Sequence, residues 1–100
     1  MIEFDWDDKK AKLNKAKHRV SLESGEPAVN DDYAVTEFND TVNDEDRWQT
    51  IGMSKNGVLL FVIHTIEENE TKPSRIISVR KADEKERRKY EKRRNIINSR

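Results

Sequence analysis

Cysteine is absent from this chain of 100 residues, so disulfide bonds, thiolate catalysis and cysteine-bound metals are excluded. Only two histidines occur, His18 and His64, and their spacing fits no metal-hydrolase motif such as HExxH. The three glycines stand apart from one another, which excludes a glycine-rich phosphate loop. The sequence therefore predicts neither a metal site nor a cofactor.

Long apolar runs are also missing. The longest, residues 58–63, has six residues, whereas a membrane-spanning helix needs about 20. The first residues are acidic and aromatic, unlike the basic and apolar start of a signal peptide. Together with the lack of cysteine, these features predict a soluble, cytoplasmic protein that does not enter a membrane.

Charge, by contrast, is abundant: 40% of the residues are charged, and the formal net charge is zero. The two signs are segregated along the chain. Residues 75–100 hold 11 Lys and Arg against 4 Asp and Glu, and residues 9–19 hold 6 Lys and Arg with no acid. Residues 20–50 hold 9 Asp and Glu against the single cation Arg47. This segregation favours a surface that binds a polyanion, because uniform mixing would indicate only solubility.

The hydrophobic pattern predicts an α+β fold of one domain, residues 1–100, built on an antiparallel sheet of four to five strands. An N-terminal helix and a basic C-terminal helix are expected to pack on one side of the sheet. The expected strands are residues 2–6, 33–38, 47–53, 58–65 and 75–80. The expected helices are residues 8–17 and 83–94, and residues 92–100 are expected to fray.

Two turns are predicted between the middle strands. Asn56 and Gly57 favour a type I′ turn, and residues 39–46 are predicted to form an acidic turn. Residues 58–63, directly after Gly57, are apolar on both faces, which indicates a central strand that is covered on two sides.

Metal-free cleavage of RNA is one chemistry that this composition allows. The 2′-hydroxyl of RNA is itself the nucleophile, so the protein needs only a base, an acid and cations that stabilise the charged transition state. Arginine suits the last role, because it binds phosphate oxygens through two N–H groups and keeps its charge. On residue types alone, a non-catalytic nucleic-acid-binding module is the stronger interpretation.

The first basic block contains a polar stripe. Lys10, Asn14, Lys17 and His18 fall on one face of the predicted helix. A solvated face explains such a stripe equally well. His18 is the best candidate for proton transfer, and its alternative role is to cap the end of the helix, where a cation meets the dipole favourably.

The candidate arginines also have structural alternatives. Arg75 and Arg80 are an odd number of residues apart, so a regular strand directs them to opposite faces unless a bulge redirects one. Arg80 is the better candidate for stabilising a phosphate, while Arg75 could pair with the acidic middle segment. Arg47 could likewise pair with Asp44 or Glu45.

Three further candidates have equally good structural explanations. Glu86 could act as a general base, but Asp83 and Glu86 also have the spacing of a capping box at the start of the last helix. Tyr90 could stack on a base or donate a proton, and it could equally belong to the core. His64, at the end of a buried strand, is expected to be structural.

Three separated motifs resemble the BrnT family of ribonuclease toxins. The first comprises Trp6, Asp7, Lys10, Asn14, Lys17, His18, Val20 and Ser21. The second comprises Arg47, Trp48, Ile51, Gly52, His64 and Thr65. The third comprises residues 75–82 with Glu86, Arg87, Tyr90 and Glu91. The resemblance covers residues 3–91, and the agreement of three motifs in the same order makes it specific.

This resemblance implies a RelE-like fold and an endoribonuclease toxin that cleaves RNA and inhibits translation. It also implies neutralisation by a BrnA-type antitoxin with a ribbon-helix-helix domain, so operator DNA would be bound only indirectly, through the antitoxin. The expected catalytic residues are His18, Arg80 and Glu86. The residues expected to contact RNA are Lys10, Lys17, Arg47, Arg75, Lys81 and Tyr90. The alternative is a non-catalytic nucleic-acid-binding or protein-interaction module that uses the same basic surface.

The chain departs from the family pattern near the end of the first helix. The family has glycine where this chain has Arg19, and a glycine would suit a left-handed helix cap. Gly25 and Pro27 disfavour a second helix within residues 21–32, so that helix is expected to be shortened or displaced. If this corner positions His18, we expect a weakened activity.

Overall fold

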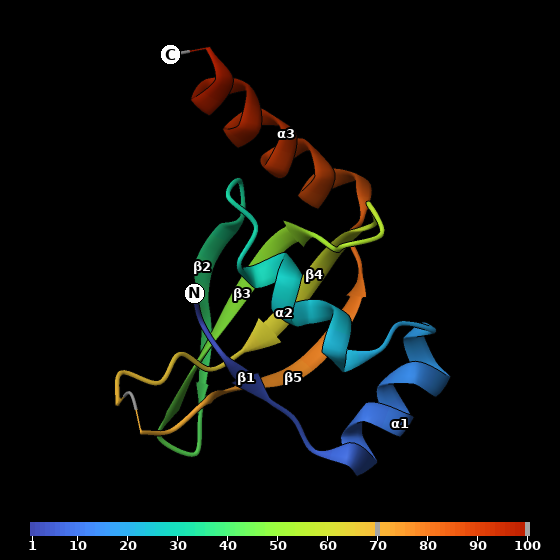
Figure 1. Cartoon of the computed structure of the whole chain (residues 1–100), viewed down its shortest axis with the longest axis vertical. Coiled ribbons are helices and arrows are strands. Elements are labelled where there is room, and N and C mark those ends of the chain that lie inside the picture. Colours follow the sequence, from blue (N-terminus) through green and yellow to red (C-terminus); the bar gives the residue numbers. More distant parts are fainter. Residues whose placement is uncertain (70, 100) are drawn as a thin grey trace.

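The computed structural model describes residues 1–69 and 71–99, which fold around a five-stranded sheet (Figure 1). The strands are β1 (Phe4–Asp5), β2 (Val35–Val42), β3 (Glu45–Met53), β4 (Leu59–His64) and β5 (Ser74–Lys81). Their order across the sheet is β1-β5-β4-β3-β2. Strands β2 to β5 are antiparallel to their neighbours, whereas β1 pairs with β5 in parallel. The α+β prediction is confirmed, with two corrections: the first strand is shorter than predicted, and its pairing is parallel.

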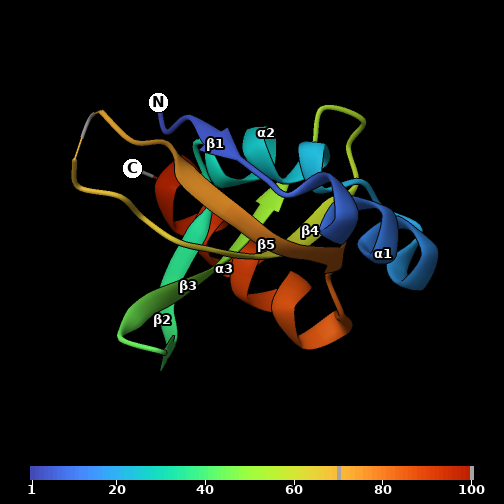
Figure 2. The ribbon, with the colours of Figure 1, turned by 90° about the horizontal axis from the view of Figure 1, so that it is seen from below.

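The helices lie on both sides of the sheet, and not on one side as predicted. They are α1 (Asp8–His18), the short 3₁₀ turn η1 (Leu22–Ser24), α2 (Gly25–Val29) and α3 (Glu84–Asn98). Figure 2 shows α2 and α3 on opposite faces, with α1 beside β5. Strand β4 is therefore covered on two sides, which confirms its prediction as a central strand and explains why its residues are apolar throughout. Within the described residues, no helix has the length and apolar character needed to cross a membrane.

Each face of the sheet has its own core. Under α2, the buried residues include Leu22, Ala28, Val62 and Val79. Gly52 of β3 is part of this contact, because a Cβ there would overlap the backbone carbonyl of Ala28. Under α3, a smaller cluster consists of Ile51, Leu59 and Tyr90. We call the first face the α2 face and the second the α3 face.

The β2–β3 hairpin corrects both turn predictions. β2 continues to Val42 and β3 begins at Glu45, so most of the predicted acidic turn is strand. Only Asn43 and Asp44 form the turn, with φ angles of 51° and 63°. Asn and Asp tolerate these left-handed angles, which a two-residue type I′ turn requires. The predicted type I′ turn at residues 56–57 is wrong.

The β3–β4 connection instead uses a longer loop. Gly57 has a φ angle of 77°, and no other residue of the loop has a positive φ angle. The Gly57 N–H donates to Ser54 O at 3.1 Å, and the Ser54 N–H donates to Val58 O at 2.9 Å. The side-chain hydroxyl of Ser54 accepts the Val58 N–H as well, which favours this wider loop.

The second helix is shortened, as expected, but it is not displaced from the core. α2 has five residues, with Pro27 in its first turn, where a missing N–H costs nothing. Gly25 lies against β5, since a Cβ there would be 2.9 Å from Cγ2 of Val79. The small residue therefore allows the start of α2 to approach the sheet closely.

The C-terminal helix is longer than predicted. α3 continues to Asn98, four residues beyond Arg94 and through most of the segment that was expected to fray. Ile97 is half-buried, and the Tyr33 hydroxyl donates to Oδ1 of Asn98 at 3.0 Å. These contacts hold the last turns of α3 against the protein.

Candidate functional site

A bulge in β5 brings Arg75 and Arg80 to the same face of the sheet. Ser78 pairs with Ile63 of β4, but the next pair is Ile76 with His64, so Ile77 has no partner. The extra residue reverses the alternation, and the buried positions change from Ser74 and Ile76 to Val79. Arg75 and Arg80 consequently both project from the α3 face.

Arg80 is held by Glu86 and by an aromatic ring. Its Nη1 and Nη2 atoms each donate to one oxygen of Glu86 at 2.8 Å. Its guanidinium lies 4.1 Å from the ring centre of Phe61, the residue directly opposite on β4. The hydrogen bonds to Glu86 raise the pKa of Arg80. A planar cation is thus fixed on the sheet with N–H groups left over for another acceptor.

Glu86 also takes part in capping the start of α3. One of its oxygens accepts the Asp83 N–H at 2.9 Å, and the Asp83 side chain accepts the Glu86 N–H at 2.8 Å, which confirms the predicted capping box. Three N–H donors surround the Glu86 carboxylate, and the side chain is 14% exposed. Both oxygens therefore already accept hydrogen bonds, from Arg80 and from the start of the helix. This arrangement fits a residue that positions Arg80 better than it fits a general base.

Arg75 forms a second arginine–carboxylate pair, with Glu45 at the start of β3. Its Nη2 and Nη1 atoms donate to the two oxygens of Glu45 at 2.6 and 3.2 Å. These bonds, helped by the charges of Arg47 and Lys10, hold the pKa of Glu45 below its ordinary value. Arg47 Nε lies 4.0 Å from Glu45, the partner predicted for Arg47 as an alternative. This Nε is buried and has no hydrogen-bond partner among the described residues.

Asn14 attaches α1 to the open edge of β5. Its amide nitrogen donates to Val79 O and to Val20 O, both at 2.8 Å. Its amide oxygen accepts the Val79 N–H at 3.1 Å. The side chain therefore takes the place of a neighbouring strand at Val79, and it is 7% exposed. The helical stripe that contains Asn14 can be predicted from the sequence, but a polar stripe does not reveal that one of its members is buried.

The attachment places the basic stripe of α1 next to the arginine strand. A shallow pocket of about 220 Å³ lies between α1 and β5. It is lined by Lys10, Leu13, Asn14, Lys17, His18, Ile77 and Ser78. Ser78 lies between Arg75 and Arg80 on β5, so the pocket adjoins the strand that carries both arginines. We call the pocket and the two arginines together the arginine face.

His18 is the last residue of α1 and is half-buried. Arg19 follows it with φ 60° and ψ 26°, and its N–H donates to Lys15 O at 2.9 Å. The predicted left-handed cap is therefore present, with arginine in the conformation that favours glycine. This cap fixes the point at which the chain leaves α1, directly after the imidazole.

Of the six predicted RNA-contacting residues, Lys10 and Lys17 line the pocket, Arg47 and Arg75 lie at Glu45, and Tyr90 and Lys81 belong to neither group. Tyr90 is 3% exposed, its hydroxyl donates to Asp31 Oδ2 at 2.6 Å, and burial raises its pKa. It belongs to the core under α3 and has no free ring face for a base. Lys81 is exposed at the end of β5, next to Arg80, and its carbonyl accepts an N–H of Arg80 at 3.2 Å.

His64 is structural, as predicted. It is 0% exposed and meets the ring of Phe4 edge-on. Its Nδ1 is 2.9 Å from Thr65 O, which can only accept, so Nδ1 carries the proton. Nε2 then accepts from the Thr50 hydroxyl at 2.7 Å. Burial lowers the pKa of His64, in keeping with a neutral ring.

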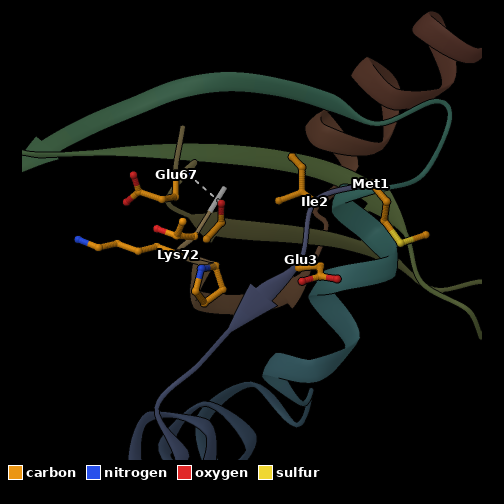
Figure 3. Close-up of a pocket in the computed structure, with 8 residues that line it drawn as sticks. Met1, Ile2, Glu3, Glu67 and Lys72 are labelled. Carbon is orange, nitrogen blue, oxygen red and sulfur yellow. Dashed lines mark hydrogen bonds between the residues drawn. The ribbon is translucent and has the colours of Figure 1, made fainter. Parts of the chain in front are cut away.

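A larger pocket, of about 490 Å³, lies elsewhere, beside β1 (Figure 3). It is lined by Met1, Ile2, Glu3, Glu67, Thr71, Lys72, Pro73 and Ser74. The Glu67 N–H donates to the Ser74 hydroxyl across it at 2.9 Å. None of the predicted site residues lines this pocket, and its described lining residues include a single cationic side chain, Lys72, and no histidine.

The fold and the arginine face together define a small α+β protein with cationic side chains gathered on one side of its sheet. Among residues 1–69 and 71–99, no three His, Asp or Glu side chains converge as a possible metal site. A family model described as the ribonuclease toxin BrnT of type II toxin-antitoxin systems matches residues 6–86. The chain therefore belongs to the BrnT family of ribonuclease toxins.

A solved structure supports the fold. The crystal structure of the Brucella abortus ribonuclease toxin BrnT is 22% identical in sequence and superposes with a TM-score of 0.57. The match covers 84% of this chain and 100% of the Brucella chain. Curated proteins yield no match.

Proposed function

We propose that the protein is a metal-independent endoribonuclease that cleaves RNA on the arginine face and thereby inhibits translation. Family membership supports a ribonuclease, and the arginine face supports the mode of cleavage. The observation that carries the proposal is the bulge at Ile77, which turns Arg75 and Arg80 toward one side, next to the His18 pocket.

In the proposed reaction, the 2′-hydroxyl attacks the adjacent phosphorus and loses its proton, while the 5′-oxygen leaves and gains one. The products are a 2′,3′-cyclic phosphate and a 5′-hydroxyl. His18 is the proton-transfer residue, because its imidazole can accept and donate a proton and lines the pocket beside β5. Arg80 stabilises the negative charge that develops on the phosphate oxygens. Glu86 positions Arg80, since its carboxylate holds the guanidinium through two hydrogen bonds.

A second group of cations, around Glu45, is assigned to neighbouring phosphates of the same RNA strand. Arg75, Arg47 and Lys10 surround Glu45, so three cations lie around a single carboxylate. Arg75 and Arg80 are five positions apart on β5, about 16 Å in a regular strand and less with a bulge. This separation suits a single strand that lies along β5. Lys17 and Lys81 supply further phosphate contacts from the rim.

A protein antitoxin is implied by the type II family. We propose that it is a BrnA-type protein with a ribbon-helix-helix domain, and that the toxin reaches operator DNA only through it. The proposed site of action is the cytoplasm, where translated RNA is found. The left-handed conformation of Arg19 supports a weakened activity, because strain at this cap is stored directly next to His18.

The test uses toxin that has been purified away from its antitoxin and refolded. We expect it to cleave RNA in the presence of EDTA and to leave cyclic phosphate ends. The variants His18→Ala and Arg80→Gln should lose cleavage, while Lys12→Ala, an exposed change on α1, should not. Wild-type protein that binds RNA with a salt-dependent affinity but leaves it intact would support the non-catalytic alternative instead.

A further inference from the structure

The second half of α3 bears apolar side chains that the fold does not cover. Tyr90 anchors the middle of the helix, but Ile96, near its end, is 50% exposed. A groove of about 580 Å³ lies between this half of α3 and β2. Its apolar lining is Val35, Ile96 and Ile97. Its charged lining is Lys92 and Arg93 together with Lys89 and Glu37, which pair with each other.

The groove is separate from the arginine face. β2 is the last strand of the sheet, at the opposite end of the strand order from β1 and two strands beyond β4. Val35 pairs with Ile51, so it shares the α3 face, and the residues that line the groove come from β2 and α3, not from β5. An ion pair at 2.8 Å between Lys89 and Glu37 ties the helix to the strand beside the groove.

The occupant of this groove must satisfy two kinds of side chain at once. Isoleucine and valine favour an apolar partner, while Lys92 and Arg93 favour carboxylates. RNA would satisfy the cations but would leave the apolar residues exposed. A second copy of this chain that docked through the same groove would bring like charges together, which opposes association. An acidic segment of a protein with apolar residues on one side matches both requirements.

We propose that this groove is the docking site for an acidic, amphipathic segment of the antitoxin. The assignment rests on the antitoxin that the family implies. It goes beyond the proposed cleavage site, because it places the antitoxin on a different surface from the arginine face that binds RNA. A segment held in the groove contacts β2 and the second half of α3, whereas Arg80 lies on β5. The rest of the antitoxin then extends toward the arginine face.

The experiment measures the affinity of purified toxin for the separately purified, full-length antitoxin of the same module, by titration calorimetry. Ile96→Asp should weaken binding about tenfold or more, because it places a carboxylate where an apolar contact is made. The double variant Lys92→Glu, Arg93→Glu should weaken it by a similar factor. The double variant Arg87→Glu, Arg88→Glu, which makes the same charge change on α3 outside the groove, is the matched control and should bind as the wild type does.

A second measurement separates docking from catalysis. Ile96→Asp and the Lys92→Glu, Arg93→Glu variant should keep the wild-type circular dichroism spectrum and the wild-type rate of RNA cleavage, yet remain active when antitoxin is added. Unchanged antitoxin affinity in both variants would overturn the proposal. So would an effect on self-association alone, measured by sedimentation. If the wild type binds antitoxin through the groove but cleaves no RNA, the proposed function fails while the docking site stands.

Discussion

Replacing Asn14 by alanine tests how the two basic parts of the chain are brought together. The asparagine amide makes three hydrogen bonds at 2.8, 2.8 and 3.1 Å, two of them to the exposed edge of β5. In the Asn14→Ala variant, the Val20 carbonyl and both backbone groups of Val79 lose their partner. Alanine cannot replace these bonds, and its short side chain leaves space between α1 and β5.

The expected loss of stability follows from these contacts. A hydrogen bond of this kind contributes about 1 kcal/mol, so three of them contribute about 3 kcal/mol. Alanine is the better helix former by up to about 0.7 kcal/mol, which opposes the loss. The net change is about 2.5 kcal/mol. For a domain of this size, it corresponds to a fall of roughly 10–20 °C in the midpoint of thermal unfolding.

Thermal unfolding followed by circular dichroism measures this change, with Lys12→Ala as an exposed control on the same helix that should shift the midpoint very little. Hydrogen exchange adds a local readout, because the Val79 amide should lose protection in the variant. A midpoint within 2 or 3 °C of the wild type, with Val79 still protected, would refute the view that Asn14 attaches α1 to the sheet.

Three further predictions concern single charges and one backbone angle. Glu45→Gln should increase the affinity for a non-cleavable RNA strand, whereas Arg75→Gln should decrease it. In Arg75→Gln, the slope of log affinity against log salt concentration should be smaller by about 0.7 per lost phosphate contact. Affinity changes of the same sign in both variants would show that the pair is purely structural. Arg19→Gly should remove the strain of a left-handed backbone at this position, and so raise the unfolding midpoint by roughly 4–8 °C, equivalent to about 1 kcal/mol. The cleavage rate should rise as well. A fall in the midpoint would contradict the observed cap. Because burial lowers the pKa of His64, the unfolded chain binds more protons, so stability should decrease as the pH falls below about 6.5. The pH dependence of the midpoint between pH 7.5 and 5.5 should be smaller in His64→Gln, and an unchanged dependence would rule out this histidine as its source.

Features that depend on local chemistry could be predicted from the sequence. The capping box of Asp83 and Glu86 depends on two residues three positions apart, and both of its hydrogen bonds are present. The left-handed cap at Arg19 follows from the end of one helix and is also present. The central position of β4 follows from apolar residues on both of its faces.

Features that depend on pairing between distant segments could not be predicted. The bulge at Ile77 is a property of the β4–β5 register, and no local pattern in residues 75–80 distinguishes a bulged strand from a regular one. The burial of Asn14 depends on an open strand edge 65 residues away. The type I′ turn was predicted at Asn56 and Gly57, but the hydroxyl of Ser54 stabilises a wider loop there.

The central claim is that RNA lies along β5 on the arginine face. The most direct test is a nuclear magnetic resonance titration with a 2′-O-methyl oligonucleotide, which binds but cannot be cleaved because its 2′-oxygen is blocked. We predict that the largest shifts occur at the side-chain Nε–H groups of Arg47, Arg75 and Arg80 and at the imidazole of His18. Shifts confined to the exposed cations of α3, such as Arg87 and Arg88, with the β5 arginines unchanged, would contradict the account.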